Sequence, residues 1–262
     1  MPALLELDHV GKRFGRITVA EDLSLSVGTG DLVGIVGPNG AGKTSLFGLI
    51  SGDLSPDSGT IRIDGRPVNG LDPALRCRLG VGRTYQVPRP FLDMTVFENV
   101  LVAAQQGAGA RGRASHELAC AVLLRCDLLG DANRRARTLG LLPRKRLEVA
   151  RALATQPRLL LLDEVAGGLT DPEVAELVAI VEGVRASGVA VVWIEHVMRA
   201  LLGTVDRMVC LAGGHIIGDG APAQVLASPE VREVFLGTEV TVEMLTEAGR
   251  RWSGRTAAEA RA

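Results

Sequence analysis

Eight residues, GPNGAGKT at 37–44, constrain the fold of this chain more than any other part of its sequence. They fit the pattern G-x-x-x-x-G-K-[ST]. The apolar stretch DLVGIVG at 31–37 leads into them, and KTSLFGLIS, which reads as a helix, begins at Lys43. A glycine-rich loop between a buried strand and a helix attracts anions, because inward-facing N–H groups and the helix N-terminus both favour negative charge. The pattern therefore predicts an α/β fold whose loop holds phosphate groups.

The loop offers both backbone and side-chain ligands. Gly37, Gly40 and Gly42 let the backbone turn its N–H groups inward. We expect Lys43 to reach the β- and γ-phosphates, and the Thr44 hydroxyl to bind Mg²⁺. The residues expected to contact a nucleoside triphosphate are Gly37, Pro38, Asn39, Gly40, Ala41, Gly42, Lys43, Thr44 and Ser45. A glycine-rich turn without function is the alternative, and the strand before it and the helix after it argue against that interpretation.

A second motif, LLLLDE at 159–164, places two acids at the end of an apolar strand. We expect Asp163 beside the phosphates, where a carboxylate holds Mg²⁺ directly or through water. Glu164 comes next and can polarise an attacking water. The same letters also fit an ordinary strand end, and the phosphate loop earlier in the chain is what favours the functional interpretation.

Composition excludes several classes of protein. Of 262 residues, 47% are hydrophobic, which is ample for a core and argues against intrinsic disorder. The net charge of −1 provides no basic field for nucleic acid. Five Phe, two Trp and one Tyr are also few for base stacking. We therefore expect no nucleic-acid partner.

Signals for secretion, membrane insertion and metal-binding cysteines are not found. The first ten residues carry acids and no long apolar core, and no apolar run approaches the roughly eighteen residues of a membrane span. The four cysteines have neither a C-x-x-C pair nor metal-ligand spacing, so we expect buried free thiols in a reducing cytosol.

Lysine is rare in this chain. Lys12, Lys43 and Lys145 are three of 29 basic residues. In so arginine-rich a sequence, a lysine indicates a position that needs a compact ammonium rather than a planar guanidinium.

Strand and helix patterns indicate an α/β core with an inserted helical lobe. Strands are expected at 4–10, 23–27, 31–37, 60–65, 81–86, 159–164 and 189–195, with a hairpin over 207–220 that turns at Gly213-Gly214. Helices are expected from 43 and at 72–79, 95–106, 115–130, 143–156, 172–186, 222–227 and 229–236. We therefore expect one domain over 1–249, with a core of about 1–94 and 157–240, a helical lobe of about 95–156, and a disordered tail at 250–262.

Together these motifs resemble the ATPase subunit of ABC transporters, over about residues 4–240. Gln86 after VGRTY matches the family's Q-loop glutamine, and His196 in VVWIEHVMRA matches its switch histidine. Phe14 in KRFGRITV matches the aromatic residue that stacks on adenine, and GGLTD at 167–171 resembles the D-loop. Each mark alone has a plainer alternative: a solvated loop glutamine, a core-edge histidine, a packing phenylalanine. Their agreement in order favours the family.

The resemblance implies a fold, a substrate and a set of site residues. The fold is the P-loop NTPase fold of ABC ATPases, with an antiparallel β subdomain and an inserted α-helical lobe. The activity is hydrolysis of ATP with Mg²⁺. The implied catalytic residues are Glu164, His196, Gln86 and Lys43, and the implied metal ligands are Thr44, Gln86 and Asp163.

Two further stretches narrow the resemblance to a subfamily. RTYQVPRPFLDMTVFENV at 83–100 and EVFLG at 233–237 resemble importers of branched-chain amino acids and related amides. This implies a peripheral subunit at the cytoplasmic face of the membrane. Its implied partners are transmembrane permease subunits, a second ABC ATPase subunit in a homo- or heterodimer and, indirectly, a periplasmic or extracellular solute-binding protein. Residues 125–151 carry eight basic residues against three acids, which is either a solvated face or a surface that docks on the permease.

One stretch departs from the family pattern. Where the family has LSGGQ or LSYGQ, this chain has LGLLP at 139–143, with Gly140 for serine, Leu142 for glycine, and Pro143 removing a backbone donor. In the family, this helix start faces the γ-phosphate held by the opposite subunit. The alternatives are an equivalent geometry from another sequence, a one-residue slip that uses Thr138, or an asymmetric dimer whose opposite site turns over slowly. A regulatory ATP-binding module and a soluble non-transport ABC ATPase are the rival functions.

Overall fold

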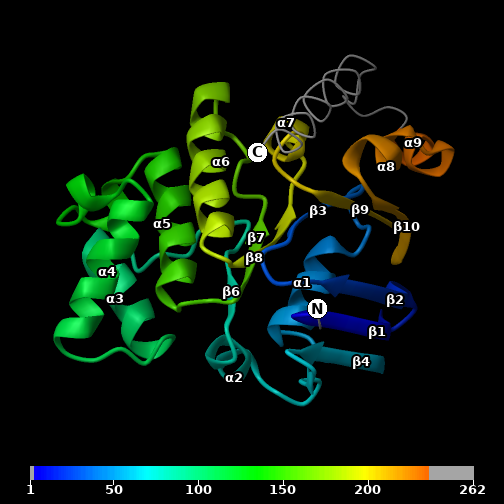
Figure 1. The fold of residues 1–262 in the computed structure, drawn as a ribbon, viewed down its shortest axis with the longest axis horizontal. Helices are drawn as coiled ribbons and strands as arrows, with labels where there is room; N and C mark the ends of the chain where they lie inside the picture. The colour runs from blue at the N-terminus through cyan, green and yellow to red at the C-terminus, as the bar shows by residue number, and fades with distance from the viewer. Residues whose placement is uncertain (1–2, 236–262) are drawn as a thin grey trace, which may run out of the picture.

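The computed structural model describes residues 3–235, which form two sheets and the helices around them (Figure 1). The strands are β1 (Leu5–Phe14), β2 (Ile17–Val27), β3 (Leu32–Val36), β4 (Ser58–Ile63), β5 (Arg66–Pro67), β6 (Val81–Arg83), β7 (Leu159–Asp163), β8 (Ala190–Ile194), β9 (Arg207–Ala212) and β10 (His215–Gly220). The helices are α1 (Lys43–Ser51), α2 (Pro73–Arg78), α3 (Val96–Gln106), α4 (Arg113–Arg125), α5 (Leu141–Ala154), α6 (Asp171–Ala186), α7 (Met198–Leu201), α8 (Pro222–Ala227) and α9 (Pro229–Phe235), with short 3₁₀ turns at Leu129–Asp131 and Ala136–Thr138.

The two sheets differ in strand direction. One is antiparallel, in the order β2-β1-β4-β5, and the other has the order β10-β9-β3-β8-β7-β6, in which all neighbours except β9 and β10 are parallel. The carboxyl ends of β3 and β7 therefore lie at the same edge. This brings the phosphate loop and the acids of LLLLDE together, as the sequence predicts.

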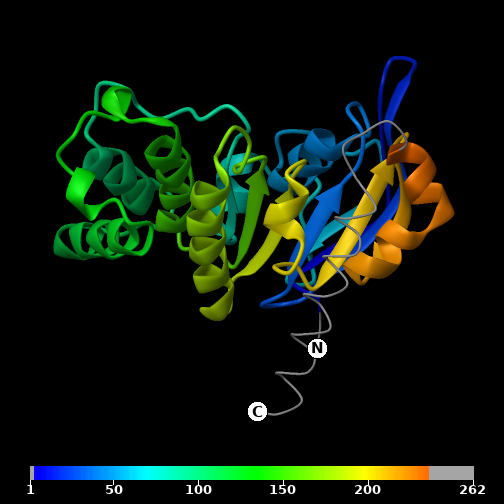
Figure 2. The same cartoon turned by 90° about the horizontal axis from the view of Figure 1, so that it is seen from above.

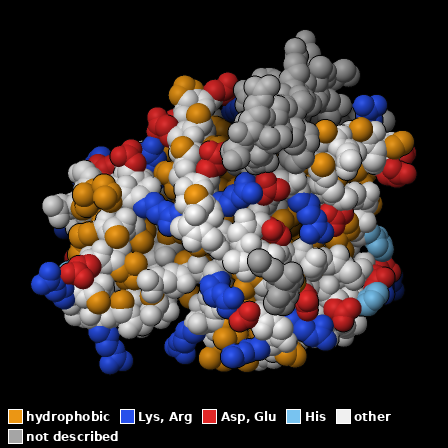
Figure 3. Space-filling model, viewed as in Figure 1, with side chains coloured by type: hydrophobic (Ala, Val, Ile, Leu, Met, Phe, Trp, Pro, Cys, Tyr) orange, Lys and Arg blue, Asp and Glu red, His pale blue; other side chains and the backbone are white. Residues whose placement is uncertain are grey.

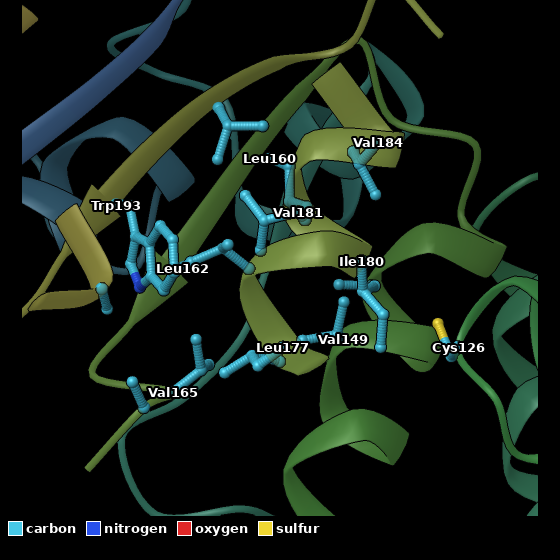
Figure 4. Close-up of a cluster of buried hydrophobic side chains, with 14 of the residues drawn as sticks. Cys126, Val149, Leu160, Leu162, Val165, Leu177, Ile180, Val181, Val184 and Trp193 are labelled. Atoms are coloured by element: carbon cyan, nitrogen blue, oxygen red, sulfur yellow. The ribbon is translucent and has the colours of Figure 1, made fainter. Parts of the chain in front are cut away.

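The central strands are buried on both faces, which explains why they are continuous apolar runs. Along β7, Leu160 and Leu162 pack into a core with the helices, whereas Leu159 and Leu161 pack into a second core with α1 and the antiparallel sheet. Figure 4 shows the first core, where Trp193 of β8 and the leucines of β7 meet side chains of α5 and α6. Both acids at the end of β7 are thus fixed by a fully packed strand.

The helices expected within 95–156 gather at one end of the molecule. Figure 1 shows α3, α4 and α5 beyond α6, opposite the end that carries β1, β2 and β4, and Figure 2 shows the same separation from above. Thr95 and Glu98 form a capping box that begins α3. The helical lobe is present as an arrangement of helices, and its status as a separate unit of the chain stays a prediction.

Several element boundaries differ from the sequence expectations. The strands expected at 4–10 and 23–27 are parts of one long hairpin, β1 and β2, which turns at Gly15-Arg16. Register shifts along β1 break its two-residue alternation, which explains why the pattern underestimates its length. The helix expected at 115–130 ends at Arg125, because Asp127 adopts a left-handed φ of +52°. The helix expected from 143 begins at Leu141, because proline is tolerated in a first helical turn.

The four cysteines differ in burial. Cys126 and Cys210 are buried, but Cys120 is exposed and Cys77 is half-buried, so the expectation of four buried thiols is wrong. Cys120 lies on the solvent side of α4, which the helical pattern of the sequence does not determine.

Within residues 3–235, no helix combines the length and apolarity needed to cross a membrane. Figure 3 shows acidic and basic side chains interspersed over one face of the molecule. The predicted tail at 250–262 and part of EVFLG lie outside the described residues.

Candidate active site

The phosphate loop joins the end of β3 to α1 and depends on glycine for its path. Gly42 is the N-cap of α1 with φ of +101°, and a Cβ there would lie 2.2 Å from the carbonyl oxygen of Val19. A Cβ at Gly37 would lie 2.1 Å from the carbonyl oxygen of Leu211. Backbone therefore packs on both ends of the loop, so only glycine fits at these positions.

Lys43 is held inside this loop. Its Nζ donates to the carbonyl oxygens of Gly37 at 2.7 Å and Pro38 at 3.0 Å, and the residue is 6% exposed. Burial lowers the pKa of Lys43, while the charges of Glu164 and Asp163 act to raise it. The ammonium is thus positioned where the loop closes, close to both acids.

A cleft of about 340 Å³ opens over the loop. Its lining residues are Ile17, Val19, Asn39, Gly40, Ala41, Gly42, Lys43, Thr44, Ser45, Gln86 and Glu164. Phe14 does not line this cleft; it is 47% exposed at the end of β1, with the Lys12 ammonium 5.5 Å from its ring centroid. Ile17 and Val19 were not singled out by the sequence, and the β1–β2 hairpin places them at the cleft because Ile17 pairs with Phe14 across its end.

Two of the expected site residues, Gln86 and His196, contact the carboxylate of a third, Glu164. Gln86 Nε2 donates to Glu164 Oε2 at 2.6 Å, and His196 Nε2 lies 2.6 Å from Glu164 Oε1. Glu164 follows β7, His196 follows β8 and Gln86 follows β6, so adjacent parallel strands deliver all three to the same edge. A carboxylate oriented from both sides in a cleft can accept a proton from a water molecule.

Asp163 has an unpaired oxygen. The residue is 1% exposed and its Oδ1 has no hydrogen-bond partner, while its Oδ2 lies 3.5 Å from Arg83 Nη2. Burial raises the pKa of Asp163, and the Arg83 guanidinium opposes that rise. Thr84 Oγ1 accepts the Asp163 backbone N–H at 3.0 Å, which fixes the acid at the strand end. Leaving a buried carboxylate oxygen unsatisfied is costly, and a cation would satisfy it.

The stretch LGLLP at 139–143, which departs from the family's sequence pattern, contains the start of α5. Gly140 is the N-cap of α5 without a side-chain cap, and Leu141 is 46% exposed. The GGLTD stretch lies against it, since a Cβ at Gly168 would be 3.2 Å from Leu141 Cδ2. The Thr138 hydroxyl donates to the carbonyl oxygen of Arg135 at 2.8 Å, so it is already engaged within its own turn.

Comparisons with known proteins identify the family of this chain. The model of the ABC transporter family matches residues 20–167. BraF, the high-affinity branched-chain amino acid transport ATP-binding protein of Pseudomonas aeruginosa, is 35% identical over 89% of this chain and 98% of its own length. LptB, the ATP-binding protein of the lipopolysaccharide export system of Acidithiobacillus ferridurans, is 34% identical over 92% of this chain and 100% of its own length.

A solved structure is also similar. The ADP conformation of an ATP-binding cassette of an ABC transporter superposes with a TM-score of 0.81 at 28% identity, covering 90% of this chain and 100% of that one. The match extends over both sheets and the helices, well beyond the phosphate loop. The chain therefore belongs to the ABC transporter family and is one of its ATP-hydrolysing cassettes.

Proposed function

We propose that this chain is the nucleotide-binding subunit that powers an ABC importer, and that the solute is a branched-chain amino acid or a related amide. The observation that carries the proposal is the contact of Gln86 and His196 with Glu164 at the mouth of a glycine-built phosphate cleft. The match to BraF, which covers nearly the full length of both chains at 35% identity, supports the choice of solute.

We assign ATP to the cleft by its chemistry. The loop N–H groups and the N-terminus of α1 suit the phosphates, and Lys43 suits the β- and γ-phosphate oxygens. Ile17 and Val19 offer apolar side chains on the cleft wall for the adenine base. Phe14, in the same hairpin, is a further candidate for stacking on adenine.

Mg²⁺ fits the polar residues of this cleft. Asp163 brings an unpaired buried carboxylate oxygen, and Thr44 and Gln86 bring a hydroxyl and an amide oxygen. Mg²⁺ keeps much of its water and takes few protein oxygens beside substrate phosphates, so a large acidic cluster is not required. When bound, the ion would neutralise phosphate charge.

Hydrolysis is assigned to the residues around Glu164. Its carboxylate would orient and deprotonate the attacking water, and His196 would contact the γ-phosphate. Gln86 would report the state of the nucleotide to the segment that follows it.

We propose the following assembly. Two such subunits, identical or different, close on ATP beneath transmembrane permease subunits at the cytoplasmic face of the membrane, and an external solute-binding protein delivers the solute. The basic stretch 125–151 is a candidate docking surface for the permease. Part of its charge is paired within the chain, as in the ion pair of Arg134 with Asp131.

A slow or regulatory opposite site is the second candidate, and the start of α5 favours it. LGLLP lacks the hydroxyl and the small residue of the family pattern, and losing one donor to transition-state charge costs about 3 kcal/mol. The chain's own cleft would then hydrolyse ATP when a partner supplies an unaltered helix start.

The assembled transporter provides the test. We expect ATPase activity of the complex with its permease to rise when a solute-binding protein loaded with leucine, isoleucine or valine is added. Stimulation only by lipopolysaccharide, the substrate named for the system of LptB, contradicts the proposed solute. Absence of ATPase activity in a complex that binds ATP favours the regulatory role.

A further inference from the structure

The turn after β7, residues 164–166, has a shape that its surroundings must maintain. Glu164 has a φ of +49°, which is unfavourable for a residue with a side chain. Its N–H donates to the carbonyl oxygen of Ile194 at 2.9 Å, which ties the start of the turn to β8. The remainder of the turn is held by two buried charged residues that do not line the nucleotide cleft.

Lys145 holds the turn from the side of α5. Its Nζ donates to the backbone carbonyl oxygen of Glu164 at 3.0 Å, and the residue is 6% exposed. Burial lowers the pKa of Lys145, and the acids that oppose this are Glu195, Glu164, Asp163 and Glu148. Lys145 is one of only three lysines in the chain, and it occupies a position where a compact ammonium reaches a single carbonyl.

Glu195 holds the turn from the side of β8. It is 1% exposed, and its Oε1 accepts the Ala166 N–H at 2.6 Å and the Trp193 indole N–H at 3.2 Å. Its Oε2 accepts the Val197 N–H at 3.4 Å. One carboxylate therefore bonds the turn that carries Glu164 and the segment that carries His196.

We propose that Lys145 and Glu195 are positioning residues that fix the Glu164 turn against α5 and against the His196 segment. The proposal rests on the assignment of Glu164 as the group that activates water. Neither residue touches the cleft, so each acts through the backbone of the turn: Lys145 through a carbonyl oxygen and Glu195 through N–H groups. A displaced turn would move the Glu164 carboxylate away from the reacting water while leaving the phosphate loop intact.

Three variants of the full chain separate this role from general stability. Lys145→Met and Glu195→Ala each remove one hold on the turn. Glu195→Gln keeps an oxygen for Ala166 and Trp193 and gives up only the longest bond, to Val197. The control is Arg146→Met. Arg146 is the next residue on α5 and is buried to a similar degree, but within the described residues its hydrogen bonds and ion pairs go to Asp127 and Glu176 and not to the turn.

Amide hydrogen exchange measures the hold without requiring turnover. We expect exchange of residues 164–167 to become at least about tenfold faster in Glu195→Ala and Lys145→Met, and to stay near wild type in Glu195→Gln and Arg146→Met. Unchanged exchange in the first two variants, or equal acceleration in the control, overturns the proposal. Because exchange is read in the free chain, this result is independent of whether Glu164 activates water.

Kinetics then test whether the hold matters for catalysis. With Mg-ATP, we expect kcat to fall about 10–100-fold in Glu195→Ala and Lys145→Met, the KM for ATP to stay within about twofold, and Glu195→Gln to recover most of the rate. A raised KM with unchanged kcat, or Glu195→Gln as slow as Glu195→Ala, contradicts positioning. If Glu164→Gln itself hydrolyses ATP like wild type, the proposed function fails instead.

Discussion

Two helix starts in this molecule, those of α1 and α5, serve related chemistry but are built differently. The start of α1 lies inside the chain's own cleft, with Lys43 buried and Glu164 nearby. The start of α5 is open, with Leu141 exposed and no side chain capping the helix. In the assembly that we propose, the start of α5 would act on a nucleotide held by the second subunit, so its partners would lie outside this chain.

The N-cap glycines make the contrast concrete. At Gly42 an added Cβ meets the backbone of Val19 and the φ is +101°, whereas at Gly140 nothing lies within 4 Å and the φ is −66°. The first glycine is required by packing within the chain, and the second is not. Packing within the chain therefore requires glycine at the start of α1, whereas it leaves room for a side chain at Gly140.

The largest expected effect is in the chain's own nucleotide cleft. Glu164→Gln should lower kcat about 10²–10⁴-fold, because the amide cannot accept the proton of the attacking water. The affinity for ATP should stay near wild type, since the phosphate loop is unchanged. Single-turnover hydrolysis and calorimetry measure the two quantities, and a variant with unimpaired turnover would remove Glu164 from the proposed role.

The next effect tests the open helix start. Replacing LGLLP by LSYGQ, through Gly140→Ser, Leu141→Tyr, Leu142→Gly and Pro143→Gln, should speed the opposite site up to about a hundredfold by restoring donors. The measurement is turnover of a heterodimer in which Glu164→Gln blocks hydrolysis in this chain's own cleft and the other subunit keeps its own catalytic glutamate. An unchanged rate indicates that the present sequence already gives an equivalent geometry.

Glu195, which accepts a hydrogen bond from the turn after β7, should make the free energy of unfolding depend on pH. Burial raises the pKa of Glu195 from its ordinary value near 4.5 to about 7; the nearby charges are those of Lys145 on α5 and Glu164 in the turn. Between those values the folded chain binds more protons than the unfolded chain. The free energy of unfolding should therefore fall as the pH rises, by on the order of 3 kcal/mol in total.

Urea denaturation at pH 5 and pH 8 measures this slope. In Glu195→Gln the side chain does not titrate, so its difference from wild type isolates the contribution of Glu195. A variant whose stability depends on pH just as the wild type does would show that Glu195 titrates in its usual range.

The smallest effect compares the two N-cap glycines directly. Gly42→Ala should destabilise the chain by about 1–3 kcal/mol and weaken ATP binding, because the alanine meets backbone in a left-handed conformation. Gly140→Ala is its matched control and should change stability by no more than about 0.5 kcal/mol. Thermal unfolding measures both changes in stability. Equal destabilisation by the two substitutions would contradict the difference between the two helix starts.

Much of this fold could be predicted from local pattern. The phosphate loop, LLLLDE and the strand at 189–195 are short apolar runs or glycine motifs whose neighbours in sequence determine their structure, and the parallel order of the strands brings their ends together. Family resemblance pointed to Gln86 and His196, since a lone glutamine or histidine carries no local signal, and their contacts with Glu164 were not predicted.

Other features depend on contacts between distant residues. Ile17 lines the cleft because of a hairpin whose irregular register hides its length from the sequence pattern, whereas the aromatic residue expected there, Phe14, does not line it. The turn after β7 is hydrogen-bonded by Lys145 and by Glu195, which lie fifty positions apart in the sequence. No sequence pattern around either residue indicates these contacts. The rarity of lysine is the one signal in the sequence that could have marked Lys145.

The central claim is that residues 37–45 with Asp163 and Glu164 form a site for Mg-ATP. Titration calorimetry of the full chain with Mg-ATP tests it most directly, with Lys43→Ala as the paired variant. The account predicts saturable heat for the wild type and a large loss of affinity for the variant, because the ammonium neutralises the phosphates. No heat from the folded wild type, or identical isotherms for the two proteins, would contradict it.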